Sequence, residues 1–170
     1  MRLAAKVAGA TFLLDQATKF AVVRGLDLFH RGEIDVIAPY LNFRMAWNRG
    51  VNFGLFAHDA EFMRWILIAI ALVVSGWVWR WTAKETAGKG DAARWHLAAT
   101  GLLVGGALGN VVDRILYGAV ADFLNMSCCG IENPYAFNVA DVTIFAGAIG
   151  LILFSGKADA KAGKGSGKGK

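Results

Sequence analysis

The hydrophobic residues of this chain are concentrated in four long stretches, at about 4–23, 63–81, 95–116 and 137–155. Each stretch is close to the ~20 residues that a helix needs to cross ~30 Å of hydrocarbon. The second is the plainest, because no charged residue lies between Trp65 and Trp79. A soluble bundle can bury one such helix, but four of them in 170 residues make a soluble fold a poor explanation. The pattern therefore predicts an all-α membrane bundle of four transmembrane helices.

The first stretch has one feature of a secretory signal peptide, because Arg2 and Lys6 precede an apolar run. A cleavable signal also requires an uninterrupted apolar core before its cut site. Here Asp15 and Lys19 interrupt the run and Arg24 follows it. We therefore expect a retained membrane helix rather than a cleaved signal.

A different period appears between the first two helices. Every second position from residue 41 is apolar, at Leu41, Phe43, Met45 and Trp47. This period of two is typical of a half-buried strand. Asn48-Arg49-Gly50 has the composition of a turn, and the residues from Val51 to Phe56 then predict a second strand. The segment at about 40–57 is therefore expected to form a small extracytoplasmic β-sheet, which either offers its aromatic side to a lipid-bearing ligand or caps the helix ends.

The charge distribution orients these helices. The net charge is +5, and basic residues gather at the amino terminus, in the connection 82–94 and in the tail 157–170. The positive-inside rule then places both termini and this connection in the cytoplasm, with segments 25–62 and 117–136 outside. We expect one domain over residues 1–156 and a disordered Lys/Gly-rich tail over 157–170. The low complexity of this tail favours solvent or lipid headgroups over nucleic acid as its partner.

Polar residues within the predicted helices share one depth. Helices one and three run outward and helix four runs inward, which brings seven residues to the outer level: Asp15, Lys19, Asn110, Asp113, Arg114, Asn138 and Asp141. Residues spaced by three or four share a helix face, so Asp15 and Lys19 can pair. Ionisable residues in membrane helices are costly and usually functional. Gly101, Gly105 and Gly109 form a stripe of small residues at which another helix can pack closely.

These carboxylates suggest acid–base chemistry. Asp122 joins the layer from the predicted outer loop 117–136. Two carboxylates in one site cannot both ionise cheaply, so one can hold a proton while the other activates water to hydrolyse an amide. This reaction requires no cofactor or metal, and Cys128 and Cys129 are too few ligands for a zinc site. Spacing alone leaves Asp15, Asp113, Asp122 and Asp141 as candidates for the pair.

Two other classes of protein remain possible from the residues alone. A proton- or ion-coupled carrier also places carboxylates and a lysine among helices, but it usually has polar groups along its whole path or an internal repeat. The inner halves of these helices offer little beyond Ser, Thr and His96. A non-enzymatic assembly protein would explain the glycine stripe and the sheet, but not the group of carboxylates.

Five short motifs, in this order along the chain, resemble those of the lipoprotein signal peptidases (signal peptidase II). They are Asp15-Gln16-Ala17-Thr18-Lys19, Asn48-Arg49-Gly50-Val51-Asn52-Phe53-Gly54, the segment from Gly105 to Arg114, Val120-Ala121-Asp122-Phe123, and Phe137-Asn138-Val139-Ala140-Asp141. The resemblance covers nearly the whole chain. It implies a membrane aspartic endopeptidase without a cofactor.

The resemblance also implies a role for each polar residue. Asp122 and Asp141 would be catalytic. Substrate contacts would come from Asn48, Asn110, Arg114 and Asn138, and support from Asp15, Lys19, Gly50 and Asp113. The implied substrate is a diacylglyceryl-modified prolipoprotein, cut on the amino side of its lipidated cysteine. The expected setting is the bacterial inner membrane, with membrane lipids and cyclic lipopeptide inhibitors as further ligands and a monomer as the default state.

Overall fold

The computed structural model describes residues 1–50, 60–127 and 133–155. Its elements, in chain order, are α1 (Arg2–Lys19), the π-helical turn η1 (Phe20–Gly25), α2 (Leu28–Arg31), β1 (Glu33–Ile37), β2 (Leu41–Asn48), α3 (Ala60–Glu85), the 3-10 turn η2 (Gly90–Ala93), α4 (Arg94–Tyr117), β3 (Val120–Met126) and α5 (Val139–Phe154). The expected hairpin partner at Val51 to Phe56, the two cysteines and the tail 157–170 lie outside the described residues.

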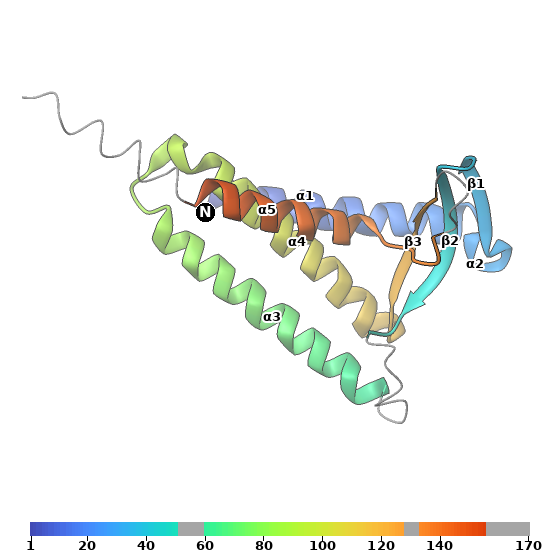
Figure 1. Ribbon diagram of the computed structural model, residues 1–170. Helices are drawn as coiled ribbons and strands as arrows, with labels where there is room; N and C mark the ends of the chain where they lie inside the picture. The colour runs from blue at the N-terminus through green and yellow to red at the C-terminus, as the bar shows by residue number, and fades with distance from the viewer. Residues whose placement is uncertain (51–59, 128–132, 156–170) are drawn as a thin grey trace, which may run out of the picture.

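The long helices are organised around α4, which packs against α1, α3 and α5. Figure 1 shows α3 on one side of α4 and both α1 and α5 on the other. The three-stranded sheet lies across one end of the bundle, beyond the carboxyl-terminal end of α1 and the start of α5 (Figure 1). This arrangement brings strands and helix ends from distant parts of the chain together.

Glycines explain why α4 lies so close to its neighbours. A Cβ added at Gly101 would lie 2.6 Å from a side-chain carbon of Val7, and one at Gly105 would lie 2.5 Å from the Ala8 carbonyl oxygen. The glycine stripe predicted on this helix is therefore confirmed as a packing surface, and its partner is α1. On the side of α4 that faces α5, Gly106 has the same role, because its added Cβ would lie 2.6 Å from the Ala140 carbonyl oxygen.

The sheet is antiparallel, with the strand order β1-β2-β3. The predicted strand over the alternating residues is confirmed as β2, but its neighbours come from segments that the pattern did not mark as strands. The segment expected to be an outer loop contains β3, so Asp122 lies in a strand, opposite Ala46 of β2. The first four residues of β3 are all buried, so apolar and polar residues do not alternate along its sequence. Strand β1 does not alternate either, because four of its five residues are exposed.

Turn chemistry directs the chain from α4 into β3. Gly118 ends α4 with φ +76°, a left-handed conformation that a residue without a side chain adopts easily. Its N–H donates to the Arg114 carbonyl oxygen at 3.1 Å. The chain then reverses, and β3 places Phe123 in a small apolar core with Val22 and Leu28.

Two of the described helical segments are long and apolar enough to cross a membrane, Glu61–Glu85 and Gly90–Tyr117. The apolar α5 is shorter, at 16 residues. The first helix, α1, contains four charged residues, Arg2, Lys6, Asp15 and Lys19. The existence of all the predicted helices is thus confirmed with ends shifted by a few residues, while the count of four membrane spans stays a prediction.

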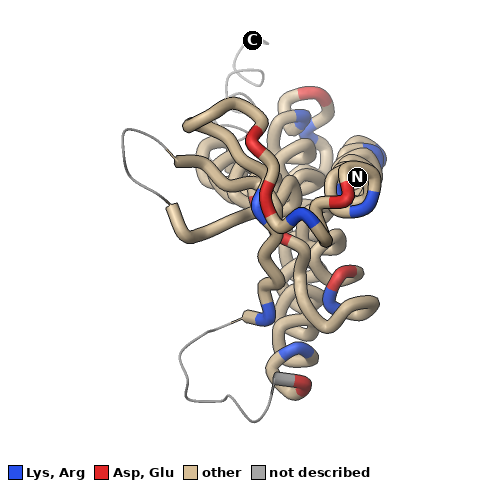
Figure 2. The backbone as a smooth tube through the Cα atoms, turned by 90° about the vertical axis from the view of Figure 1, so that its right-hand side faces the viewer, with Lys and Arg blue, Asp and Glu red and all other residues tan. Residues whose placement is uncertain are grey.

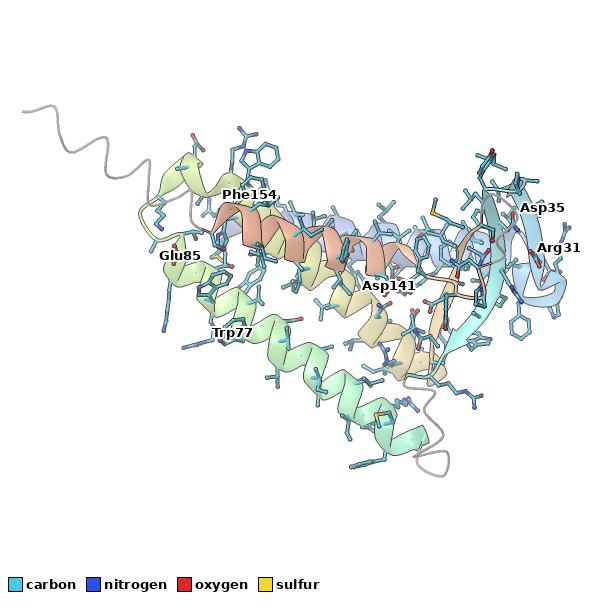
Figure 3. All side chains as sticks on the ribbon, viewed as in Figure 1. Arg31, Asp35, Trp77, Glu85, Asp141 and Phe154 are labelled. Atoms are coloured by element: carbon cyan, nitrogen blue, oxygen red, sulfur yellow. The ribbon has the colours of Figure 1, made fainter. Side chains whose placement is uncertain are left out.

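The outer surface of the bundle is apolar. Large hydrophobic side chains such as Val73, Phe145 and Ile152 are 71%, 69% and 79% exposed. Figure 3 shows such side chains projecting from the helices along their length, and labels Asp141 near the sheet end of α5 and Phe154 at its other end. Exposure on this scale is expected of a surface that faces lipid rather than water. In Figure 2, which looks onto the sheet end, acidic and basic positions lie close together there.

Candidate active site

Asp122 is a buried carboxylate held from two sides. Its side chain lies on β3 and is 3% exposed. Asn138 donates from Nδ2 to Asp122 Oδ1 at 2.6 Å, and Asn48 donates from Nδ2 to Asp122 Oδ2 at 3.1 Å. Both carboxylate oxygens therefore have a fixed donor, one at the start of α5 and the other at the end of β2.

Asp141 lies in the first turn of α5 and is part of its cap. The Asn138 side chain accepts from the Asp141 N–H at 2.9 Å, and Asp141 Oδ2 accepts from the Asn138 N–H at 3.2 Å. This reciprocal arrangement is a capping box. The other oxygen, Oδ1, accepts from Asn110 Nδ2 at 2.8 Å. Asp141 is only half-buried, so it is the more accessible of the two carboxylates.

Asn110 and Asn138 connect the two carboxylates. Asn138 Nδ2 lies 3.2 Å from Asn110 Oδ1, in addition to its contact with Asp122. Asn110 in turn donates to Asp141. The two amides thus form a continuous hydrogen-bonded path between the carboxylates, and each amide oxygen and nitrogen has a partner.

Lys19 supplies the positive charge beneath this path. Its Nζ atom lies 2.8 Å from Asp15 Oδ2 and 2.8 Å from Asp113 Oδ2, and it donates to Asn110 Oδ1 at 3.2 Å. The lysine is 6% exposed, and its two acidic partners are less exposed still. The predicted pairing of Asp15 with Lys19 is confirmed, and Asp113 joins it from α4.

The two supporting carboxylates hold the backbone next to the two candidate catalytic ones. Asp113 Oδ2 accepts from the N–H of Ala121 at 3.2 Å, one residue before Asp122. Asp15 Oδ1 accepts from the N–H of Ala140 at 2.9 Å, one residue before Asp141. Both strand and helix are therefore anchored to the same buried ion cluster at the position where their aspartates project.

Asn48 is oriented by the turn that follows β2. Its Oδ1 accepts from the Gly50 N–H at 2.9 Å, which leaves Nδ2 free to donate to Asp122. Gly50 has φ +102°, and a Cβ there would lie 2.6 Å from Leu67 Cδ1 of α3. The left-handed backbone conformation therefore favours glycine at this position.

Arg114 lies at the edge of the group. Its Nη1 donates to the Asn110 carbonyl oxygen at 3.4 Å, a long contact, and its buried Nε has no hydrogen-bond partner among the described residues. Arg114 therefore has donor capacity available beside the two candidate catalytic residues.

Sequence reasoning assigned no role to Gln16. Its Nε2 donates to Asp15 Oδ2 and Asp113 Oδ1, both at 3.1 Å. It therefore bridges the two supporting carboxylates beside Lys19. Its position between Asp15 and Lys19 in the first motif was the sequence feature that could have suggested a role for Gln16. However, a polar residue next to an aspartate does not by itself indicate a contact with another helix.

The electrostatics of the two candidate carboxylates differ. Burial, followed by the nearby negative charge of Asp141, raises the pKa of Asp122 to about 6. The hydrogen bonds from Asn48 and Asn138 act in the opposite direction, as does the charge of Lys19. A carboxyl group with such a pKa can hold a proton near neutral pH. The described residues contain no group of three or more potential metal-binding side chains.

The chain matches known proteins over most of its length. The family model described as signal peptidase (SPase) II matches residues 7–156. A lipoprotein signal peptidase of Methylobacterium sp. (strain 4-46) is 41% identical over 146 residues, which cover 86% of this chain and 84% of the relative. That of Methylobacterium radiotolerans is 43% identical over 145 residues, which cover 85% and 80%.

Two solved structures of a bacterial membrane enzyme, obtained by the in meso method, have a similar fold. One, at 2.3 Å resolution, is 26% identical with a TM-score of 0.66 and covers 100% of this chain and 94% of its own. The other, at 1.9 Å, is 25% identical with a TM-score of 0.72 and covers 90% and 92%. From the family model and these relatives, the chain belongs to the signal peptidase II family, the lipoprotein signal peptidases, and is a peptidase that removes signal peptides from prolipoproteins.

Proposed function

We propose that Asp122 and Asp141 are the catalytic pair of an aspartic-type hydrolysis of the signal peptide bond. The observation that carries this proposal is the amide path through Asn110 and Asn138, which holds two carboxylates of different burial in one site. Asp15 and Asp113 are better suited to support, because each is ion-paired with Lys19 and also accepts a backbone N–H.

The two aspartates have different tasks in this proposal. Asp122 holds the proton, because burial and the charge of Asp141 raise its pKa. Asp141 accepts a proton from the attacking water, and Asp122 hydrogen-bonds the carbonyl oxygen of the scissile peptide. Asp141 then gives this proton to the nitrogen of the leaving amine, the tetrahedral intermediate collapses as the C–N bond breaks, and the pair returns to its starting state. Water is the nucleophile, and no covalent bond to the enzyme forms.

The substrate contacts follow from groups with spare donors near the pair. Arg114 presents a guanidinium whose Nε has no partner in the part of the chain that the structure describes, and Asn48 lies at the end of β2 beside Asp122. We propose that they bind backbone carbonyls of a diacylglyceryl-modified prolipoprotein, which is cut on the amino side of the lipidated cysteine. The exposed apolar surface of the helices keeps the acyl chains in lipid while the peptide reaches the sheet end.

The proposed setting is a bacterial inner membrane with four spans, both termini in the cytoplasm and the site near the outer leaflet. The basic residues of the connection 82–94 and of the amino terminus support this orientation. We further propose a monomer, with a single domain over residues 1–156 and inhibition by cyclic lipopeptides. Such inhibitors would occupy the substrate position beside Asp122 and Asp141.

The test is cleavage of a purified lipidated prolipoprotein by Asp122→Asn and Asp141→Asn enzymes in detergent or nanodiscs. Both variants are expected to fold, as judged by thermal unfolding, and to lose cleavage. Lys6→Gln, an exposed basic residue at the other end of α1, serves as the control that keeps activity. Normal cleavage by either aspartate variant would remove that residue from the catalytic pair.

A further inference from the structure

A cavity of about 660 Å³ lies at the sheet end of the molecule, between the carboxyl-terminal parts of α1 and α4, the segments η1 and α2, and the strands β2 and β3. Its lining residues do not include Asp122 or Asp141. Lys19, Gln16 and Asp113 form part of its floor, so it lies against the ion cluster that supports the catalytic pair. The volume falls in the range of about 300–1,000 Å³ that is usual for small-ligand sites. The cavity therefore borders the candidate active site without including the side chains of Asp122 and Asp141.

Aromatic side chains form the mouth of this cavity. Phe20, Phe29 and Tyr117 line it and are 67%, 55% and 51% exposed. Trp47 lines it from β2, with its ring centroid 5.8 Å from that of Tyr117. Exposed aromatic rings around a hollow are typical of surfaces that contact acyl chains and headgroups at a membrane interface.

One cation at the mouth is available to a ligand. Arg24 lines the cavity, is exposed, and has no side-chain ion pair or hydrogen bond with another described residue. The other charged side chains of the lining have partners, because Asp27 contacts His30 at 2.6 Å and Lys19 lies between Asp15 and Asp113. Arg24 is therefore the lining cation whose donors are available to a ligand.

The depth of Arg24 fits a lipid phosphate. At 1.5 Å per residue, Arg24 lies roughly 30 Å along the first helix from its start, which is about one hydrocarbon thickness. Phe20 lies one turn deeper, on the hydrocarbon side. A ligand with a phosphate at Arg24 and an acyl chain along the aromatic wall thus matches both the charge and the polarity gradient.

We infer that this cavity binds an anionic phospholipid of the leaflet that surrounds the sheet end. The phosphate is bound by Arg24, and one acyl chain contacts Phe20, Phe29 and Tyr117. This site goes beyond the proposed peptidase function, and its occupant is a bilayer lipid rather than the substrate. Its floor shares Lys19 and Asp113 with the active site, so the lipid packs against the ion cluster.

The test uses the full chain in nanodiscs and two photoreactive probes with the same diazirine-bearing acyl chain. One probe is a phosphatidylglycerol, and the other is a diacylglycerol without phosphate. Cross-linked peptides are identified by mass spectrometry, and labelling at the cavity is divided by labelling at the lipid-facing residues Val73 and Trp77 of α3. The readout is binding, so it does not depend on whether cleavage occurs as proposed.

In the wild-type protein the phosphatidylglycerol probe is expected to label the cavity about fivefold more than the diacylglycerol probe, since one basic residue contributes about 1 kcal/mol to phosphate binding. Arg24→Gln should abolish this preference, and Arg44→Gln, an exposed arginine of β2 that does not line the cavity, should keep it. Equal labelling by the two probes in the wild type would overturn the inference and indicate that the cavity binds an acyl chain of the substrate. Labelling no higher than on α3, or an unchanged preference in Arg24→Gln, would overturn it as well.

Discussion

Asn138 donates a hydrogen bond of 2.6 Å from its side-chain amide to Asp122, and the same side chain caps the helix that carries Asp141. One residue therefore has two separable functions, one through nitrogen and one through oxygen. The nitrogen orients a carboxylate on the strand. The oxygen begins α5 and so fixes the direction in which Asp141 projects.

Asn138→Ser should separate these two functions. A serine hydroxyl can still cap α5, because Ser and Asn are comparable N-cap residues. It cannot also reach Asp122, and losing a hydrogen bond to a charged group costs about 1.5–3 kcal/mol, or roughly 10–100-fold in rate. We expect the unfolding temperature to fall by less than in Asn138→Ala, and kcat/KM to fall by that factor. Asn138→Ala, which also removes the cap, should lower both quantities, and equal losses of stability in the two variants would contradict the separation.

The pH dependence of cleavage should report the proton on the catalytic pair. The pKa of Asp122 is about 6, and the proposed reaction needs its proton. We expect kcat/KM to fall as the pH rises, with an apparent pKa near 6 that belongs to the pair as a whole. Asn138→Ser should move this limb to higher pH, because the hydrogen bond from Asn138 lowers the pKa of Asp122. A limb that does not move would show that another group titrates.

The same pKa predicts how stability depends on pH. A carboxyl group whose pKa is higher in the folded than in the unfolded state binds more protons when folded, so its contribution to stability falls as pH rises between about 4 and 6. We expect the free energy of unfolding in detergent to decrease over this interval in the wild type. Asp122→Asn should lack this part of the slope. Identical slopes in the two proteins would mean that Asp122 titrates normally.

Lys19→Met should be strongly destabilising. It leaves Asp15 and Asp113 as buried acidic residues without a cation, and breaking a buried ion pair from one side costs about 3–5 kcal/mol. The measurement is thermal unfolding in detergent, with Lys6→Met as the control on the exposed part of the same helix. A small effect, comparable to that of the control, would show that Gln16 and the backbone donors are enough to hold Asp15 and Asp113.

Gly109→Ala should disturb the site through packing. The added methyl group would lie 2.5 Å from Asp15 Oδ2, so the carboxylate must move, which disturbs the contact of Oδ2 with Lys19 and that of Oδ1 with the Ala140 N–H. Overpacking of this kind costs about 1–3 kcal/mol, and cleavage should fall with it. Gly76→Ala on α3 is the matched control, because a Cβ there has no atom within 4 Å. Equal behaviour of the two variants would exclude a packing role for Gly109.

The helices and the polar layer could be predicted because both depend on local spacing. An apolar run marks a helix wherever its partners lie, and the separation of Asp15 from Lys19 places both on one face. The strand β3 could not be found in this way, since it is buried on both faces and its sequence does not alternate. Its partner β2 was found because apolar residues occupy every second position of its sequence from Leu41 to Trp47.

The contacts between helices were the part of the site that spacing could not provide. The pattern placed Asp113 near the outer end of its helix, but not next to the N–H of Ala121 or opposite Gln16. Such contacts depend on how α1, α4 and β3 pack. The choice of Asp122 and Asp141 from four aspartates likewise came from the family resemblance. The geometry adds that Asp15 and Asp113 are both paired with Lys19.

The pairing of Asp15 with Lys19 within a single helix has a consequence for biosynthesis. In the proposed membrane arrangement, α1 is synthesised and inserted before α4 and α5 exist, so Asp113 and the Ala140 N–H are not yet available. A single buried charge at the centre of a helix costs about 2.5–3.5 kcal/mol during insertion. Because the two side chains lie one turn apart and meet at 2.8 Å, each neutralises the other from the time the first helix forms. The nascent helix thus carries its own counterion until the rest of the protein is made.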